Sequence, residues 1–293
     1  MLSLSDRNIR VRQIHHRDFD RLATFLCRGF RSRTREFWLQ ALVNIEAHQT
    51  PNGFPRFGYI LEDADTIVGA ILAIFSMVKE GTSTSGIRCS VSSWYVEPSF
   101  RPYAGLLVSK VFAHKGVTYV NVTAAPFTWP ILAAQGYTQY SQGIFLSLPV
   151  LHYPSERVHA TIVDAASDPV APFSSFERDI VRDHAAAGCV SFWCSTPERA
   201  YPFVFRSRSA KLVPIFAQLI YCTSIDAFVR FAGSIGAHLL RRGRPFAIID
   251  ADGPIPGLAG KFFAGKEPKF YRGPHRPRLG DLAYTESGLF GAS

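Results

Sequence analysis

The chain has 293 residues, of which 47% are hydrophobic and only 19% are charged. This composition excludes an intrinsically disordered chain, which would contain fewer apolar residues, and a coiled coil, which would contain many more charged ones. The length fits one large domain or two domains of about 150 residues each.

The net charge of +9 is concentrated towards the end of the sequence. Residues 201–293 contain thirteen basic and six acidic side chains, whereas residues 1–200 are close to neutral. A basic segment is compatible with a nucleic acid, an anionic membrane, a phosphorylated small molecule or a solvated surface without a ligand. No nucleic-acid motif and no alternation of aromatic and basic residues accompanies it, so we expect no nucleic-acid partner.

Targeting signals and metal-binding patterns are not found in the sequence. The start, MLSLSDRNIRVRQ, has no apolar core of signal-peptide length, and the longest apolar run, residues 67–78, is too short to span a membrane. The five cysteines form no CxxC pair, so we expect reduced thiols and no metal site. These features predict a cytoplasmic protein without a membrane span.

Hydrophobic periodicity in the first half predicts helices packed on a mixed sheet. The expected elements, in chain order, are strand 11–14, helices 19–30 and 34–46, a hairpin of strands 58–61 and 67–78, a loop at 79–86, strand 87–96, helix 103–114, strand 117–122, a short helix at 128–135 and strands within 137–148. Antiparallel strands come first and a strand–helix–strand crossover follows, and such a crossover makes neighbouring strands parallel. The predicted fold class is therefore α/β with a mixed sheet.

The second half repeats part of this pattern. Residues 110–122 and 237–249 both read as a helix end, a glycine and a strand, and residues 128–143 resemble residues 257–273 in the order short helix, glycine, aromatic strand. The other expected elements are helices 176–187 and 225–242 and strands 190–194, 203–208, 217–223 and 282–285. The repeat predicts two domains, 1–150 and 158–293, with a linker at 149–157.

Two glycines interrupt the predicted helix 225–242. Gly233 and Gly236 fit a glycine-rich anion-binding loop, or they mark a place where the helix packs closely against another segment. The apolar side chains around them keep helical spacing, which favours close packing.

The segment after strand 87–96 resembles the acyl-CoA motif of the GNAT superfamily, the acyl-CoA N-acyltransferases. The family pattern is V-x-P-x-Y-R-G-x-G-x-G/A-x-x-L, and the chain reads Val96-Glu97-Pro98-Ser99-Phe100-Arg101-Pro102-Tyr103-Ala104-Gly105-Leu106-Leu107. Val96, Pro98, the aromatic Phe100 and Arg101 fit the pattern. Ala104 and Leu106 stand where glycines are expected. Gly136-Tyr137 is a second match, but Leu132 stands where many members have the tyrosine that protonates the leaving thiolate.

The resemblance implies two tandem GNAT-like domains with an acyl-CoA site in the first. Backbone N–H groups at a helix start hold the CoA pyrophosphate in this family, and glycines permit close approach. The matching positions are Val96, Arg101, Pro102, Tyr103, Ala104, Gly105 and Leu106. The implied co-substrate is acetyl-CoA or another acyl-CoA, with no metal.

The implied reaction is transfer of an acyl group from CoA or another pantetheine thioester to an amine of a small molecule or protein. Acetyl is the first candidate for the acyl group. Glu97 is the candidate base, or else a solvated turn residue, and Asn121 faces the pantetheine arm or is an ordinary strand residue. The replaced glycines and Leu132 favour an alternative, a catalytically inactive GNAT-like protein that binds a ligand or partner. The retained Val-x-Pro-x-Phe-Arg favours the enzyme.

Overall fold

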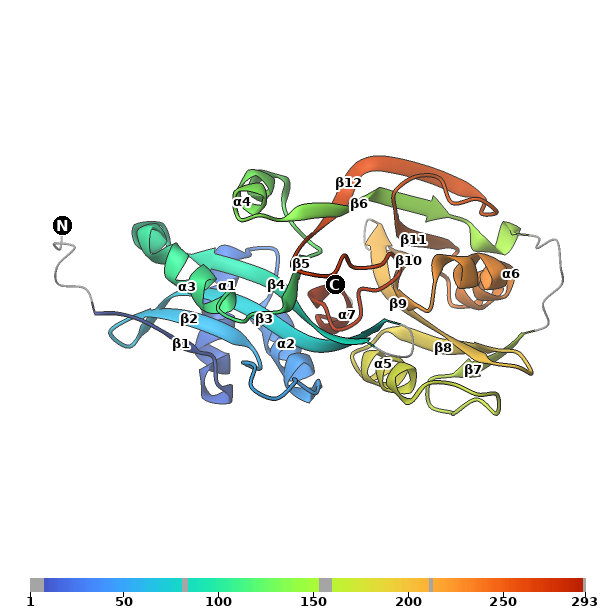
Figure 1. Ribbon diagram of the computed structural model, residues 1–293, viewed down its shortest axis with the longest axis horizontal. Helices are drawn as coiled ribbons and strands as arrows, with labels where there is room; N and C mark the ends of the chain where they lie inside the picture. The colour runs from blue at the N-terminus through green and yellow to red at the C-terminus, as the bar shows by residue number, and fades with distance from the viewer. Residues whose placement is uncertain (1–7, 81–83, 153–159, 211–212, 292–293) are drawn as a thin grey trace. The chain divides into compact units, whose positions relative to one another are not determined.

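The computed structural model describes residues 8–80, 84–152, 160–210 and 213–291, which form two compact units (Figure 1). Unit 1 comprises residues 1–121 and 272–275, and unit 2 comprises residues 122–271 and 276–293. The units do not divide at residues 149–157, because the strand at 138–147 pairs with two strands of unit 2. The sequence-based limits 1–150 and 158–293 stay a prediction, and residues 153–157 of the linker lie outside the described residues.

Unit 1 is built on a sheet with the strand order β1-β2-β3-β4-β5. Its antiparallel strands are β1 (Ile9–Gln13), β2 (Gly58–Asp63), β3 (Thr66–Glu80) and β4 (Thr84–Val96). The last strand, β5 (Val117–Asn121), runs parallel to β4. The connection between them is the 3₁₀ helix η3 (Pro98–Tyr103) followed by α3 (Ala104–Val111), which is the crossover that the sequence predicts.

Helices cover both faces of this sheet. The helices α1 (Phe19–Gly29), preceded by the turn η2 (His16–Asp18), and α2 (Arg35–Ala47) pack against each other, and α1 contacts β3 and β4. Gly29 of α1 lies on the ring of Tyr95, where an added Cβ would come within 2.4 Å of Cγ. Leu107 of α3 packs beside Val96, and adjacent strand residues point to opposite faces, so α1 and α3 lie on opposite sides of β4.

A buried ion-pair cluster joins β1, β2 and the start of α1. Arg12 donates to Asp18 at 2.7 and 2.8 Å and to Glu62 at 2.8 and 2.9 Å. Both carboxylates are 1% exposed. Burial alone would raise the pKa of each carboxyl group, but the hydrogen bonds from Arg12 hold the pKa of Asp18 and Glu62 below their ordinary values.

Unit 2 repeats the antiparallel-then-crossover order in the strands β12-β6-β11-β10-β9-β8-β7. Its strands are β6 (Thr138–Ser147), β7 (Thr161–Asp164), β8 (Val190–Ser195), β9 (Ala200–Ala210), β10 (Val213–Cys222), β11 (Phe246–Ala251) and β12 (Gly260–Arg272). Its helices are η4 (Pro126–Thr128), α4 (Trp129–Ala134), η5 (Pro149–Leu151), α5 (Ser175–Ala186), α6 (Ile225–Arg241) and α7 (Glu286–Leu289). The long helix α6 joins β10 to β11, which run parallel.

The core of unit 2 lies between α6 and the sheet. Phe228, Phe231 and Ile235 of α6 pack with Phe203 and Phe205 of β9, among other buried residues. An added Cβ on Gly236 would lie 2.2 Å from the backbone nitrogen of Val150. The mid-helix glycine thus serves the close packing of α6 on η5, as the helical spacing of its neighbours predicts.

The helix–glycine–strand repeat is confirmed in part. Gly116 and Gly243 both have a φ of 73° and directly precede β5 and β11. Gly243 ends α6, whereas Gly116 ends a turn that follows α3. The predicted similarity of residues 128–143 and 257–273 is wrong in part: the first segment forms α4 and most of β6, whereas residues 260–272 form one long strand.

Three further expectations from the sequence are corrected. The predicted loop 79–86 is mostly strand, because β3 and β4 pair as far as Glu80 and Thr84, and residues 81–83 lie outside the described part. The strand predicted at 282–285 reduces to one bridge between Tyr221 and Asp281, because Tyr284 turns the chain with a φ of 55°. Strand β7 was not predicted.

We expect Arg12→Met to lower the free energy of unfolding by about 3–5 kcal/mol at pH 7, because it leaves the buried Asp18 without its ion-pair partner and leaves Glu62 with Arg10 and Arg21 only. Urea unfolding monitored by circular dichroism measures the loss. Lowered carboxyl pKa values stabilise the folded state above the unfolded pKa of about 4, and this contribution is lost as pH falls through the folded values. The difference in the free energy of unfolding between the variant and the parent protein should therefore become smaller below about pH 4.

The exposed Arg31→Met is the matched control and should change the free energy of unfolding by less than about 0.5 kcal/mol. An equal, small effect of both substitutions would contradict the role of Arg12.

Candidate functional site

An open backbone edge of unit 1 lies where β4 and β5 diverge. The two strands pair from Ile87–Val117 to Ser90–Val120, and β4 then continues alone to Val96. Among the described residues, no strand or loop pairs with this edge of β4 from 91 to 96. Its backbone N–H and C=O groups are therefore available to an extended ligand that carries amide groups.

A β-bulge reshapes β4 at the point of divergence. The register with β3 shifts between Ala70–Tyr95 and Leu72–Ser92, so two residues of β4 oppose one residue of β3. Ser93, within the bulge, has a φ of 51°. Bulges of this kind are common beside active sites because they turn backbone groups out of the ladder.

The loop that follows β4 offers few free backbone donors. Pro102 has no N–H group, and the N–H of Ala104 donates to the carbonyl of Arg101, so η3 runs directly into α3. Gly105 faces open space, since an added Cβ would meet nothing within 4 Å, and Leu106 is 46% exposed. The helix start is therefore a weaker anion site than one with unpaired N–H groups.

The motif side chains differ in exposure. Val96 is buried beneath α3, Tyr103 and Ala104 are half-buried, and Arg101, Pro102, Gly105 and Leu106 are exposed. The guanidinium of Arg101 is thus the positive charge that the motif presents to solvent.

Glu97 begins the loop and is held by α1. Arg28 Nη1 donates to Glu97 Oε1 at 2.9 Å, and the Glu97 N–H donates to the Val68 carbonyl at 2.9 Å. The Glu97 side chain remains 26% exposed. Arg28 also lines a cavity of about 380 Å³ between α1 and the β2–β3 turn, together with Phe25 and Ile67 among others.

Glu97 and Asn121 do not share one position along the sheet. Because Ser90 is level with Val120, Asn121 ends β5 beside Val91. Glu97 lies six residues further along β4, roughly 20 Å in an extended strand. Asn121 is therefore near the bulge and Glu97 near the loop.

In unit 2 the corresponding edge is filled by the chain itself. Strands β10 and β11 pair only from Phe216–Phe246 to Gln218–Ile248 and then diverge. Residues 280–282 occupy the vacated edge of β10: Cys222 N donates to Gly280 O at 2.9 Å, and Leu282 N donates to Ile220 O at 2.7 Å. An extended ligand cannot pair there unless this segment leaves.

The start of α6 differs from that of α3 as well. The Ser224 hydroxyl accepts from the Ala227 N–H at 3.0 Å and caps the helix, and Asp226 adds a negative charge in the first turn. This helix start satisfies its own donors and disfavours a phosphate.

Comparison with solved structures identifies the architecture. The structure is similar to a GCN5-related N-acetyltransferase from Kribbella flavida (TM-score 0.58, 13% identity, 92% of this chain and 72% of that chain). It is also similar to a conserved protein of unknown function from Enterococcus faecalis (TM-score 0.52, 13% identity, 94% and 73%). The chain has the GNAT fold.

A third similar structure is Eis1 from Mycobacterium abscessus (TM-score 0.51, 12% identity, 94% of this chain and 74% of that chain). At these identities the similarity establishes the fold. The amino-acid sequence matches no protein-family profile, and no curated protein matches it. The GNAT resemblance carried by Val96–Leu107 is confirmed at the level of fold, and the roles of the individual site residues stay predictions.

Sequence reasoning missed two parts of this region. The partner of Glu97, Arg28, lies 69 residues earlier in the chain, and no spacing rule connects them. A strand was predicted at 282–285, but the pairing of residues 280–282 with β10 was not, because periodicity does not specify the partner of a strand.

Within the described residues no group of three or more His, Cys, Asp or Glu side chains is arranged to hold a metal ion. None of the helices there is long and apolar enough to cross a bilayer.

We expect Leu282→Pro to lower the free energy of unfolding by about 3 kcal/mol or more, because proline removes the N–H that pairs with Ile220 and Leu282 is only 2% exposed. Leu282→Val keeps the N–H and should cost about 1 kcal/mol. Thermal and urea unfolding of both variants measure the difference. Equal losses would show that the backbone pairing of this segment contributes little.

Proposed function

We propose that the protein is an N-acyltransferase that transfers an acyl group, acetyl in the first place, from CoA or another pantetheine thioester to an amine of a small molecule or protein. The observation that carries the proposal is the open edge of β4 beside β5 in a chain with the GNAT fold. The same edge in unit 2 is occupied, so the donor site is assigned to unit 1.

The pantetheine arm carries amides that can pair with the free backbone groups of β4. Arg101 and the loop at Val96–Leu106 would face the pyrophosphate, and the arm would run back along the edge towards Ser93 and Asn121. A backbone N–H of the bulge would polarise the thioester carbonyl, and the amide of Asn121 would bind the arm.

The chemistry is a substitution at the thioester carbon. The amine nitrogen attacks the carbonyl carbon, the C–N bond forms, the C–S bond breaks and the CoA thiolate leaves. A base accepts the proton from the amine, and we assign that base to Glu97, whose distance from the bulge requires a chain of several waters between the two. Leu132 is buried where the family has a tyrosine, so the thiolate would take its proton from solvent.

The distance between Glu97 and the bulge gives Glu97 a second possible role. Through its ion pair with Arg28, Glu97 ties the loop to α1 and positions Arg101. A base and a loop anchor differ in what they change, since the base acts on turnover and the anchor acts on donor binding.

A non-catalytic ligand-binding protein is the second candidate function. The paired N–H of Ala104 and the absence of an N–H on Pro102 favour it, because both weaken the pyrophosphate site. The two functions differ in whether acyl transfer follows donor binding.

We expect acetyl-CoA to bind the full chain with one site, measured by isothermal titration calorimetry, and Arg101→Gln to weaken binding about tenfold by removing a charge-assisted hydrogen bond. The matched control is Lys115→Gln, which removes an exposed charge in the same unit and should leave affinity unchanged. No binding of acetyl-CoA or of longer acyl-CoAs at millimolar concentration would overturn the donor site.

We expect Glu97→Gln to lower the rate of acyl transfer about 100-fold while the affinity for acetyl-CoA stays within about threefold. Free thiol release in the presence of a panel of amines measures the rate. Arg28→Met breaks the same ion pair and keeps the carboxylate, so it separates base from anchor. Weaker donor binding in both variants with unchanged turnover would assign Glu97 to the anchor role.

A further inference from the structure

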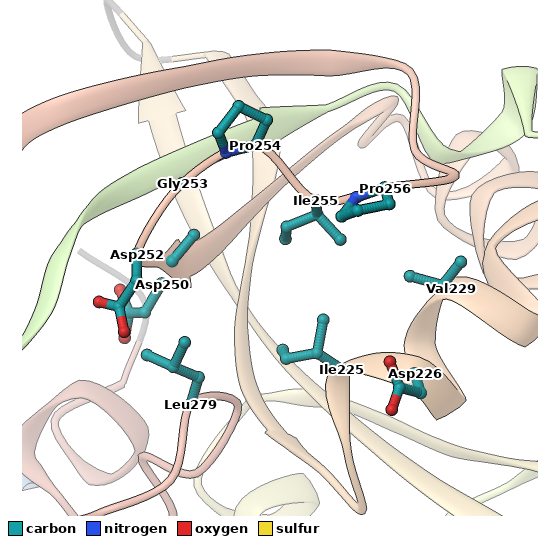
Figure 2. Close-up of a pocket in the computed structure, with 11 residues that line it drawn as sticks. Ile225, Asp226, Val229, Asp250, Asp252, Gly253, Pro254, Ile255, Pro256 and Leu279 are labelled. Atoms are coloured by element: carbon teal, nitrogen blue, oxygen red, sulfur yellow. The ribbon is translucent and has the colours of Figure 1, made fainter.

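The C-terminal tail, residues 280–290, is a buried segment of unit 2. Every residue of the tail is buried, including its polar and charged ones. The tail begins on the edge of β10 and ends with α7. Leu279, the residue before it, lines a cavity of about 400 Å³ together with the start of α6 and the loop after β11 (Figure 2). The close packing therefore begins at Gly280, whose φ of 77° turns the chain.

Helix α5 holds the middle of the tail through Tyr284. The Tyr284 N–H donates to Nε2 of His184 at 3.1 Å, and the Tyr284 hydroxyl donates to Oδ2 of Asp183 at 2.8 Å. The rings of His184 and Tyr284 also pack together, with their centroids 5.0 Å apart. The tail therefore depends on His184 for one of its backbone hydrogen bonds.

His184 can accept this hydrogen bond only as a neutral imidazole. Its Nδ1 lies 2.9 Å from the carbonyl oxygen of Ile180, which can only accept, so Nδ1 carries the ring hydrogen. Nε2 then has a lone pair for the Tyr284 N–H. The ring is fully buried, and a Cβ added to Gly288 would lie 2.7 Å from Nε2. A second ring proton would therefore point at the Tyr284 N–H inside the protein, where the two donors repel each other.

The groups beside the ring and the tail give a charged imidazole little help. Asp183 favours it, but Oδ2 of Asp183 already accepts from Tyr284. Arg206 of β9, which donates to a carbonyl of the tail at 3.4 Å, disfavours it. Cys189 donates to another tail carbonyl, and burial raises the pKa of Cys189 to about 12, so this thiol stays neutral. Other titratable groups on the packed elements are Glu177 and Asp179 of α5, Tyr221 of β10, Glu286 of the tail and the ion pair of Asp281 with Arg278.

We propose that protonation of His184 releases the tail, so that the tail is a pH-sensitive cover of the β10 edge. In the covered state a second ring proton costs the hydrogen bond to Tyr284 and brings a charge into the core. In the released state the ring is in water and takes up the proton at an ordinary pKa of about 6.5. The released state therefore binds more protons, and the equilibrium moves towards release as pH falls below about 6.5. Release would expose backbone groups of Ile220 and Cys222, and it does not depend on acyl transfer.

Hydrogen–deuterium exchange of the full chain at pH 7.5 and pH 5 tests the release. Below about pH 6.5 each pH unit favours release about tenfold, so the protection of the tail amides, corrected for the intrinsic pH dependence of exchange, should fall about 30-fold. The tail should also exchange faster than the buried face of α6, because it opens without the rest of unit 2. Unchanged protection of the tail, or exchange of the tail and α6 at one rate at both pH values, would overturn the proposal.

Variants identify the titrating group. His184→Gln supplies an amide oxygen for the Tyr284 N–H and an amide N–H for Ile180 but takes up no proton, so the loss of tail protection between the two pH values should shrink to less than about threefold. The matched control His238→Gln changes another buried histidine of unit 2, on α6, and should keep the loss of about 30-fold. A loss of that size in His184→Gln would contradict the proposal. The comparison of the parent protein at the two pH values needs no variant, so it remains decisive if His184→Gln does not fold.

Discussion

A strand that extends beyond its neighbour has backbone N–H and C=O groups that need another hydrogen-bond partner. The two units meet this need differently. In unit 1, β4 continues for six residues after its last pair with β5, and the described chain does not cover that edge. In unit 2, residues 280–282 cover the corresponding edge of β10 with two backbone hydrogen bonds. The same fold therefore leaves one edge free to pair with a substrate and closes the other.

Several basic side chains of the C-terminal half form ion pairs within unit 2. Arg208 pairs with Glu267, Lys269 with Asp250, and other ion pairs join Arg276 to Asp252 and Arg278 to Asp281. Side chains already paired in this way add little to the attraction of an anionic ligand. The charge distribution along the sequence is thus a poor guide to the proposed donor site, which we assign to the nearly neutral half.

Sequence reasoning predicted what depends on local pattern. The crossover helices, the helix stop at Gly243 and the buried face of α6 follow from periodicity and glycine placement, and the structure confirms them. The β4 bulge, the Arg28–Glu97 pair and the C-terminal segment on β10 depend on contacts between distant residues. Periodicity carries no information about such contacts, which explains why the motif was located and its surroundings were not.

The state of the loop determines where donor binding energy would come from. With the Ala104 N–H already paired and Pro102 lacking one, the helix start contributes little to a pyrophosphate, and Arg101 is the charge that remains. The open edge of β4 is intact and would pair with the pantetheine amides in any donor. The proposed site would distinguish CoA from a shorter pantetheine thioester mainly through one exposed arginine, a difference of about tenfold in affinity. The backbone of β4, rather than the phosphate loop, would therefore supply most of the contacts to the proposed donor.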